Sequence, residues 1–339
     1  MLALSWILIG GILILLQRGR TIPTVFLDEL VYGRPAQNLG YGEGLTFQGF
    51  DPSVRSLYPY LIAPAYALLR GPEAHQLALA INALVMTSAI FPAYLLARRV
   101  ASFPWALASA AVAVLTPSIV WAGMLMSEAL AYPCAALALL LTVRAVREPG
   151  TGTALLAATG GIIATAVRVQ LVVLLVVLVV AILVDVALAG RAGIPQHLRP
   201  RLPALALFAF GGLGAAALVA RGHGDVLLGH QACDLRLGAS VQSLLGKAVE
   251  YVGVVFVASV GLPLLAWLAL AFERPAWRDR EVRALLAVGG ATVGLLIVQA
   301  AFFAVTVSPQ LQERYVFYAT PVLAALLPVA ASEARARVV

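Results

Sequence analysis

Residues 152–189, GTALLAATGGIIATAVRVQLVVLLVVLVVAILVDVALA, decide the fold class of this chain. The run is about 38 residues long and almost uncharged, which is enough for two helices that each cross about 30 Å of hydrocarbon. Arg168 interrupts it near the middle, where a lone arginine costs a few kcal/mol unless it pairs or reaches the surface. We therefore expect two membrane spans, with Arg168 in the turn between them.

The whole chain has the composition of a membrane protein. Of its 339 residues 62% are hydrophobic and only 12% charged, against about a quarter charged in soluble proteins, and its mean hydropathy is +0.95. The apolar runs are continuous rather than alternating, which favours helices over strands. We predict an all-α polytopic membrane protein with about ten transmembrane helices, at 2–16, 74–97, 104–123, 128–146, 152–167, 169–189, 204–221, 248–272, 283–306 and 315–330.

Charge sets the predicted topology. A net charge of +7 would suggest a nucleic-acid partner in a soluble protein, but here most basic residues lie in short loops between spans. Arginines gather in alternate loops, a face that the positive-inside rule makes cytoplasmic. The first loop, residues 17–73, then lies outside, although Arg18 and Arg20 would favour the inside. Residues 1–339 are predicted to be one transmembrane domain, without a C-terminal soluble domain.

The first loop contains the longest polar stretch near the start of the chain, FLDELVYGRPAQNLGYGEGLTFQGFDPSVRSLYP at 26–59. The segment 57–69 that follows has two prolines and is too short to cross, so we interpret it as an interfacial or re-entrant segment. Any catalytic carboxylate is expected in this loop, among Asp28, Glu29, Glu43 and Asp51.

Two interpretations remain open for the acidic pair at the start of this loop. Asp28 and Glu29 could simply be first-turn acids of a short helix capped by Thr24 or Asp28. Alternatively, a carboxylate held at the membrane surface could deprotonate an acceptor hydroxyl. Glu128 poses the same choice, because Ser127 is a natural helix cap in front of it.

Cations and aromatic rings suggest where a phosphate could bind. Arg168 in its turn could clamp a phosphate through the planar guanidinium. Arg314 and Tyr315 open the last span, where an interfacial ring beside a solvated cation is the simpler interpretation. We place Tyr58 with them among the predicted substrate-binding residues.

The sequence has no strong metal or nucleotide motif. The potential ligands of the 222–247 loop match no closed zinc pattern, so we predict no metal site there: His223, His230, Cys233 and Asp234. A disulfide between Cys134 and Cys233 stays open. Gly246 and Lys247 lack the remaining residues of a phosphate-binding loop.

The order of short motifs along the chain resembles the GT-C superfamily of polytopic glycosyltransferases. The branch it resembles most contains bacterial protein mannosyltransferases and aminoarabinose transferases. The motifs are LDELVYGRPAQNL, SLYPYLIAPAYALL, LARRV, MSEALAYP, an arginine between two spans, and ERYVFYATP. The resemblance covers nearly the whole chain and implies juxtamembrane helices in the first outer loop. Many relatives continue with more spans and an outer soluble domain, which this sequence does not include.

The resemblance also implies a reaction and its residues. A sugar would move from a polyprenyl-phosphate donor to a hydroxyl of a glycan, lipid or protein acceptor at the outer face of the cell membrane. Asp28 would be the general base and Glu29 its support, while Glu128, Arg168 and Arg314 would lie near the donor phosphate. A divalent metal ion stays open, since members of the family differ. A transporter or flippase of lipid-linked sugars is the alternative, and a non-catalytic scaffold is a third.

Overall fold

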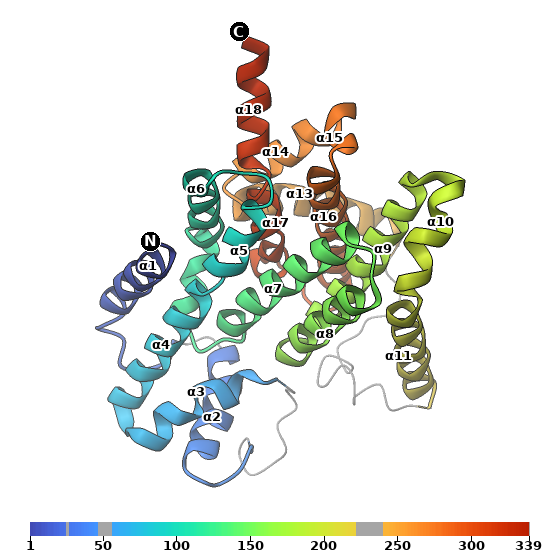
Figure 1. Ribbon diagram of the computed structural model, residues 1–339. Helices are drawn as coiled ribbons and strands as arrows, with labels where there is room; N and C mark the ends of the chain where they lie inside the picture. The colour runs from blue at the N-terminus through green and yellow to red at the C-terminus, as the bar shows by residue number, and fades with distance from the viewer. Residues whose placement is uncertain (25–26, 47–55, 222–239, 339) are drawn as a thin grey trace.

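The computed structural model describes residues 1–24, 27–46, 56–221 and 240–338. Every regular element in these ranges is helical, which confirms the all-α prediction (Figure 1). The first half of the chain forms α1 (Leu2–Leu16), α2 (Leu27–Gly40), α3 (Tyr58–Leu68), α4 (Gly71–Thr87), α5 (Ile90–Ala97), α6 (Phe103–Val114), the 3-10 helix η1 (Pro117–Gly123), α7 (Glu128–Arg147) and α8 (Thr151–Val167).

Shorter and more broken elements follow in the second half. They are η2 (Val169–Val172), α9 (Val173–Leu188), α10 (Gly190–Leu198), η3 (Arg199–Arg201), α11 (Leu202–Ala220), α13 (Val241–Ala258), α14 (Leu262–Ala271), α15 (Arg274–Arg278), α16 (Arg280–Thr306), η5 (Glu313–Tyr315), η6 (Phe317–Ala319), α17 (Thr320–Ala324) and α18 (Leu327–Val338).

Several helices have the length and composition of membrane spans. Six helical stretches of the described chain are long and apolar enough to cross a bilayer, or seven if α6 and η1 form one bent span. Three shorter apolar helices, α1, α8 and α14, accompany them. The structure therefore shows a multi-pass membrane protein, and the number of ten spans stays a prediction.

Several predicted spans are not single straight helices. The predicted span 248–272 divides into α13 and α14 because Val260 and Gly261 both have positive φ, 60° and 74°, a conformation that ends a right-handed helix. The predicted span 104–123 bends by 62° between α6 and η1. The predicted span 315–330 begins as two 3-10 turns and continues through α17 into α18.

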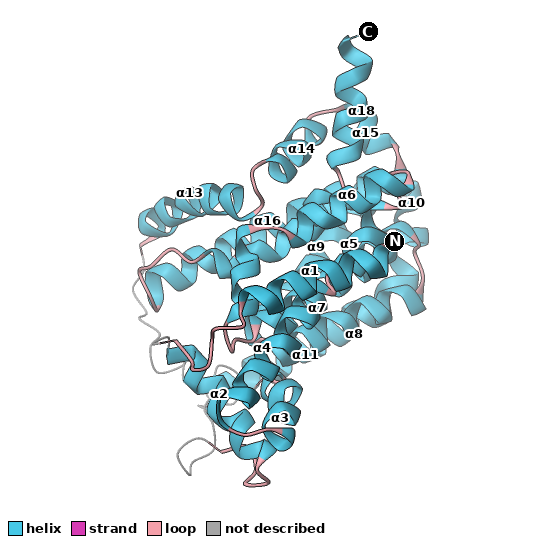
Figure 2. Ribbon diagram, turned by 90° about the vertical axis from the view of Figure 1, so that its left-hand side faces the viewer, coloured by secondary structure: helices cyan, strands magenta, loops and turns pink. Residues whose placement is uncertain are grey.

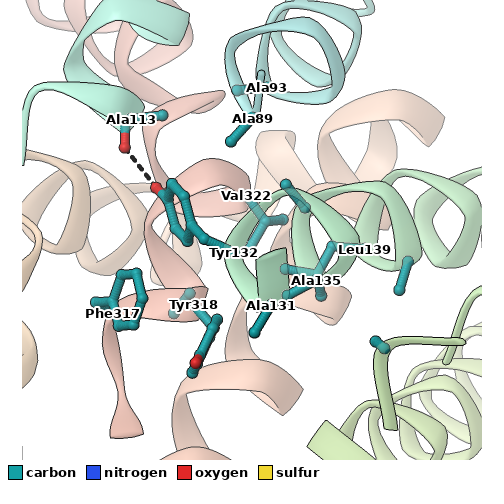
Figure 3. Packing of buried hydrophobic residues seen from close by; sticks show 14 of the residues in the cluster. Ala89, Ala93, Ala113, Ala131, Tyr132, Ala135, Leu139, Phe317, Tyr318 and Val322 are labelled. Atoms are coloured by element: carbon teal, nitrogen blue, oxygen red, sulfur yellow. Dashed lines mark hydrogen bonds between the residues drawn. The ribbon is translucent and has the colours of Figure 1, made fainter. Parts of the chain in front are cut away.

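Helix α7 lies at the centre of the bundle and contacts α4, α5, α8, α9 and α16. Alanines cover much of its buried surface, and small side chains let membrane helices approach closely. Its Tyr132 ring stacks on Phe317 with centroids 4.8 Å apart, and its hydroxyl donates to the Ala113 carbonyl (Figure 3). This aromatic contact fixes the start of the last helical segment against α7.

The helices α2 and α3 form one end of the molecule, whereas α10, α15 and the C-terminal end of α18 lie at the other (Figures 1 and 2). Helix α3 is the predicted interfacial segment and packs on α2 and α4. The chain leading into α3 is tied to the end of α8, since the Leu57 amide donates to Ala166 O (3.1 Å) and Ser56 Oγ to Val167 O (2.5 Å). These bonds hold the first loop against the turn that carries Arg168.

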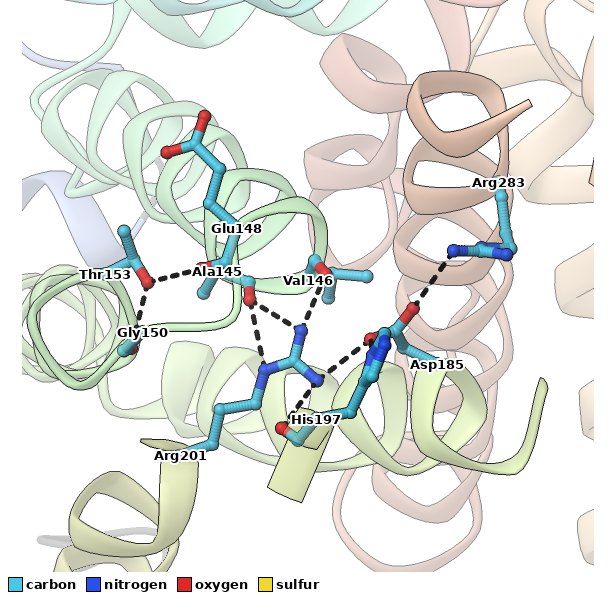
Figure 4. Close-up of polar contacts among 9 residues, drawn as sticks. All are labelled: Ala145, Val146, Glu148, Gly150, Thr153, Asp185, His197, Arg201 and Arg283. Carbon is cyan, nitrogen blue, oxygen red and sulfur yellow. Dashed lines mark hydrogen bonds and ion pairs between the residues drawn. The ribbon is translucent and has the colours of Figure 1, made fainter. Parts of the chain in front are cut away.

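A buried ionic cluster closes the α10 end of the bundle (Figure 4). Arg201 is fully buried and donates to Ala145 O (2.9 Å), Val146 O (2.6 Å) and Asp185 Oδ2 (2.9 Å). It thereby satisfies carbonyls at the C-terminal end of α7, which have no partner within their own helix. We call Asp185, His197, Arg201 and Arg283 the Asp185 cluster.

Candidate active site

The adjacent carboxylates at the start of α2 have different surroundings. Glu29 is buried and accepts hydrogen bonds from the amides of Thr24 (2.5 Å) and Leu125 (2.8 Å). The Thr24 hydroxyl also donates to Glu29. The capping of α2 by Thr24 or Asp28 stays a prediction, since residues 25 and 26 lie outside the described residues. Asp28 points elsewhere, to Arg314, with Oδ2 2.5 Å from Nη1. Glu29 therefore positions α2, and Asp28 is the carboxylate of this pair that a ligand can reach.

Four predicted residues meet in one chain of alternating charges, Arg168, Glu128, Arg314 and Asp28, which we call the Asp28 cluster. Glu128 Oε1 lies 2.8 Å from Arg168 Nη1 and 3.6 Å from Arg314 Nη1. Arg314 in turn pairs with Asp28. The residues come from α2, α7, the α8–η2 turn and η5, so the fold brings together charges that are far apart in the sequence.

The helix ends explain how each charge reaches the Asp28 cluster. Glu128 is the first residue of α7, and Arg168 occupies the predicted turn, with extended backbone between α8 and η2. Ser127 precedes α7 but makes no capping bond, because its Oγ accepts from Arg168 Nη1 (2.9 Å) instead. The capping interpretation of Ser127 is therefore wrong, whereas Glu128 does lie in the first turn, as predicted.

Two glutamines that the sequence did not single out orient the arginines. Gln170 Oε1 accepts from Arg168 Nε at 2.7 Å, and Gln312 Oε1 accepts from Arg314 Nε at 2.5 Å. Each glutamine stands two residues from its arginine, and the Gln170 carbonyl also accepts from Gln299 of α16 (2.8 Å). A glutamine two residues from an arginine is common in sequences, so these pairs could be predicted only after the arginines were identified as site residues.

Tyr315 lies between the two cations. Its ring centroid is 5.4 Å from the guanidinium carbon of Arg314 and 5.9 Å from that of Arg168, within the range of cation–π attraction. Phe303 of α16 packs on the same ring with centroids 4.9 Å apart. Tyr315 is thus a wall of the Asp28 cluster rather than an isolated interfacial ring.

Tyr58 lies behind the Asp28 cluster. Its buried hydroxyl accepts from Asn82 Nδ2 at 2.8 Å, and Asn82 Nδ2 also donates to Met124 O at 2.7 Å. The Tyr58 ring meets that of Tyr32 edge to face, with centroids 5.5 Å apart, and the Tyr32 hydroxyl accepts from Ser127 Oγ. Direct contact between Tyr58 and a substrate stays a prediction, since its hydroxyl is already bonded to Asn82.

Electrostatics keep the cations charged. Burial lowers the pKa of Arg168 and of Arg314, but the attraction of the Glu128 carboxylate opposes it, and both pKa values are raised. Burial raises the pKa of Tyr32, whose hydroxyl stays protonated. The side chains of Glu128, Arg168 and Arg314 are 0%, 8% and 11% exposed, whereas that of Asp28 is 35% exposed. Asp28 is thus the member of the cluster that a ligand meets first.

The Asp28 cluster does not have the ligands for a metal ion. Its two carboxylates are each paired with arginine, and no group of three or more His, Cys, Asp and Glu suitable for a metal occurs in the described chain. The loop residues His223, His230, Cys233 and Asp234 lie outside the described residues, as does Asp51. We derive no step through a metal.

The all-α membrane fold of this chain is also found among solved structures. Two structures of ArnT from Cupriavidus metallidurans have a similar fold. The one bound to undecaprenyl phosphate has a TM-score of 0.65 at 14% identity, over 97% of this chain and 60% of that chain. The apo structure has a TM-score of 0.61 at 13% identity, over 97% and 59%.

These likenesses confirm the predicted fold and concern the fold alone, given the low identity. The chain spans about 60% of the length of ArnT. The sequence matches no protein-family model and no curated protein.

Proposed function

We propose that this chain is a GT-C-type glycosyltransferase that moves a sugar from a polyprenyl-phosphate carrier to an acceptor hydroxyl. The observation that carries the proposal is the Asp28 cluster, in which the buried Arg168, the largely buried Arg314 and the partly exposed Asp28 meet beside the predicted juxtamembrane helices. The ArnT structure with undecaprenyl phosphate supports the class of donor, because its fold is the fold of this chain.

The arginines suit the phosphate of the donor. Guanidinium groups bind phosphate oxygens through charge-assisted hydrogen bonds, and Gln170 and Gln312 hold both groups in fixed orientations. Two carboxylates already balance the two arginines, so a donor phosphate must displace one pairing. The contact between Arg314 and the exposed Asp28 is the easier one to replace, since Glu128 is fully buried.

The displaced Asp28 is then free to act as a base. In the proposed step the acceptor oxygen attacks the anomeric carbon while its proton passes to Asp28, and the bond from that carbon to the phosphate oxygen breaks. The polyprenyl phosphate leaves with the electron pair of that bond, and Arg168 and Arg314 stabilise its growing negative charge. A single displacement of this kind inverts the anomeric centre.

The proposed site faces the extracytoplasmic side. Figure 1 places α2 and α3 at the end opposite α10 and α15. Basic residues gather at that opposite end, such as Arg278 at the end of α15 and Arg280 at the start of α16. The positive-inside rule assigns that basic end to the cytoplasm. Arg20 opposes this orientation in the sequence, but its guanidinium donates to Gly123 O and lies 3.9 Å from Glu29. It has a structural role that accounts for its position outside.

The test is sugar transfer by the reconstituted protein from a panel of synthetic polyprenyl-phosphate sugars. We expect labelled sugar in an acceptor together with free polyprenyl phosphate, and no transfer from nucleotide sugars. Arg314→Gln should slow transfer more than tenfold, whereas Glu43→Gln, an exposed change in the same loop, should not. Intact donor moving across the bilayer without any transfer would contradict the proposal and favour the transporter.

A further inference from the structure

The turn of residues 168–172 joins α8 to α9, and we call it the Arg168 turn. Hydrogen bonds from distant parts of the chain hold it on both sides. Just before the turn, the Val167 carbonyl accepts from Ser56 Oγ of the first loop (2.5 Å). Inside the turn, the Gln170 carbonyl accepts from Gln299 Nε2 of α16 (2.8 Å). Both donors are more than a hundred residues away in the sequence.

The two bonds differ in what they do for the backbone. The extended backbone of Arg168, with φ −149° and ψ 113°, ends α8, so the last carbonyls of that helix have no partner within it. Ser56 supplies one of the missing donors. The Gln170 carbonyl also accepts from the Val173 amide, so it has a partner without Gln299. The bond from Gln299 therefore fixes where the turn lies.

Gln299 differs from the other polar side chains of its span. Residues 284–306 of α16 are apolar apart from Thr292, Gln299 and Thr306. The two threonines donate to carbonyls of α16 itself, whereas Gln299 donates to another segment. An amide in an apolar span is costly unless it finds a hydrogen-bond partner. The contact with the Arg168 turn accounts for a glutamine at this position.

The same face of α16 also supports the second cation of the Asp28 cluster. Phe303 lies four residues after Gln299, which places the two side chains on one side of the helix. Phe303 packs on the ring of Tyr315, which in turn lies beside the Arg314 guanidinium. Helix α16 thus contacts the segments that carry both arginines, and it fixes their positions relative to each other.

We propose that Gln299 is a positioning residue for the donor phosphate, on which it acts through the Gln170 carbonyl and Arg168. The inference deepens the proposed sugar transfer and rests on it. Arg168 Nε donates to Gln170 Oε1 (2.7 Å), so a shift of Gln170 moves the guanidinium as well. The planar guanidinium binds phosphate through directed hydrogen bonds, and a displacement of about 1 Å is enough to weaken such a contact.

The experiment measures steady-state kinetics of Gln299→Met, which removes the amide and keeps a side chain of similar length. We expect the KM for the polyprenyl-phosphate sugar to rise about fivefold, because Arg168 contacts the donor phosphate before the reaction begins. The affinity for polyprenyl phosphate without a sugar should fall by about the same factor, and the KM for the acceptor should not change. Thr292→Val, which removes a hydrogen bond inside α16, is the matched control and should change none of these.

A double-mutant cycle separates the positioning of Arg168 from a general loss of stability. In an Arg168→Lys background the guanidinium is already absent, so Gln299→Met should raise the donor KM by less than about twofold more. In an Arg314→Lys background the same change should still raise it about fivefold. A glutamine with a purely structural role would lower the unfolding temperature and give the same factor in both backgrounds.

An unchanged donor KM in Gln299→Met, or an equal rise in the two backgrounds, would overturn the inference. Should Gln299→Met fold poorly, Gln299→Leu is measured in the same way and has to show the same dependence on Arg168. A wild-type protein that transfers no sugar would contradict the proposed function itself. An active wild type with an unaffected Gln299→Met variant would contradict this inference alone.

Discussion

The two ionic clusters of this protein use the same residue types at opposite ends of the bundle. In the Asp185 cluster, Arg201 is fully buried and its hydrogen bonds go to carbonyls and to Asp185 (Figure 4). In the Asp28 cluster, side chains from four separate segments pair with one another, and Asp28 is 35% exposed. A saturated cluster supports the fold, whereas a cluster with an accessible, replaceable ion pair can bind a ligand.

The largest effect is expected where the saturated cluster is broken. Arg201→Met should lower the free energy of unfolding by about 3–5 kcal/mol. The change leaves Asp185 buried with one partner fewer, and it leaves carbonyls at the end of α7 buried without a hydrogen-bond donor. Titration with a denaturing detergent measures this loss. Arg221→Met, at the end of α11, is the matched control and should change stability little. An equally stable Arg201→Met variant would break the contrast between the clusters.

A smaller effect, on activity rather than stability, is expected in the Asp28 cluster. Arg314→Lys should slow sugar transfer about tenfold, or about 1.4 kcal/mol in transition-state free energy, because an ammonium keeps the charge but cannot reproduce the planar, oriented contacts to Asp28 and Gln312. Steady-state kinetics with the donor varied measure it. Full activity of the lysine variant would mean that charge alone suffices there.

The smallest effect is expected at Tyr58, which should contribute a little to stability and little to sugar transfer. Tyr58→Phe removes the hydroxyl that pairs with Asn82, at about 1 kcal/mol of stability for one buried hydrogen bond. Sugar transfer should change less than threefold, since the hydroxyl faces Asn82 rather than Arg168. Thermal unfolding and transfer are measured on the same sample. A tenfold loss of transfer with unchanged stability would instead make Tyr58 a substrate-binding residue.

Much of this architecture could be predicted because its signals are local. Continuous apolar runs predict helices that cross a membrane, and a charge such as Arg168 within such a run predicts a turn or a partner. The polar first loop marked Asp28, and the ends of predicted spans marked Glu128 and Arg314, three residues that the structure brings together. Their order along the chain was enough to suggest the fold, although the identity to ArnT is only 14%.

Other features depend on contacts that no local pattern reveals. The division of the predicted span 248–272 depends on a positive φ at Val260, a residue that rarely adopts one. In the sequence, Arg201 looks like a residue that only sets the topology. In the structure it donates to a carbonyl at the C-terminal end of α7, more than fifty residues away in the sequence. Ser127 stands at the position of a helix cap in the sequence, but its hydroxyl accepts a hydrogen bond from Arg168 instead.

The most direct test of the contrast compares Asp28→Asn with Asp185→Asn, the same chemical change in the two clusters, by sugar transfer and by unfolding. We predict that Asp28→Asn loses transfer about a hundredfold or more with little change in stability, because the proposed base is removed from a partly exposed position. Asp185→Asn should unfold more easily, while its folded fraction transfers sugar at nearly the normal rate. Normal transfer by Asp28→Asn, or a selective loss of transfer in Asp185→Asn, would contradict the assignment of the active site.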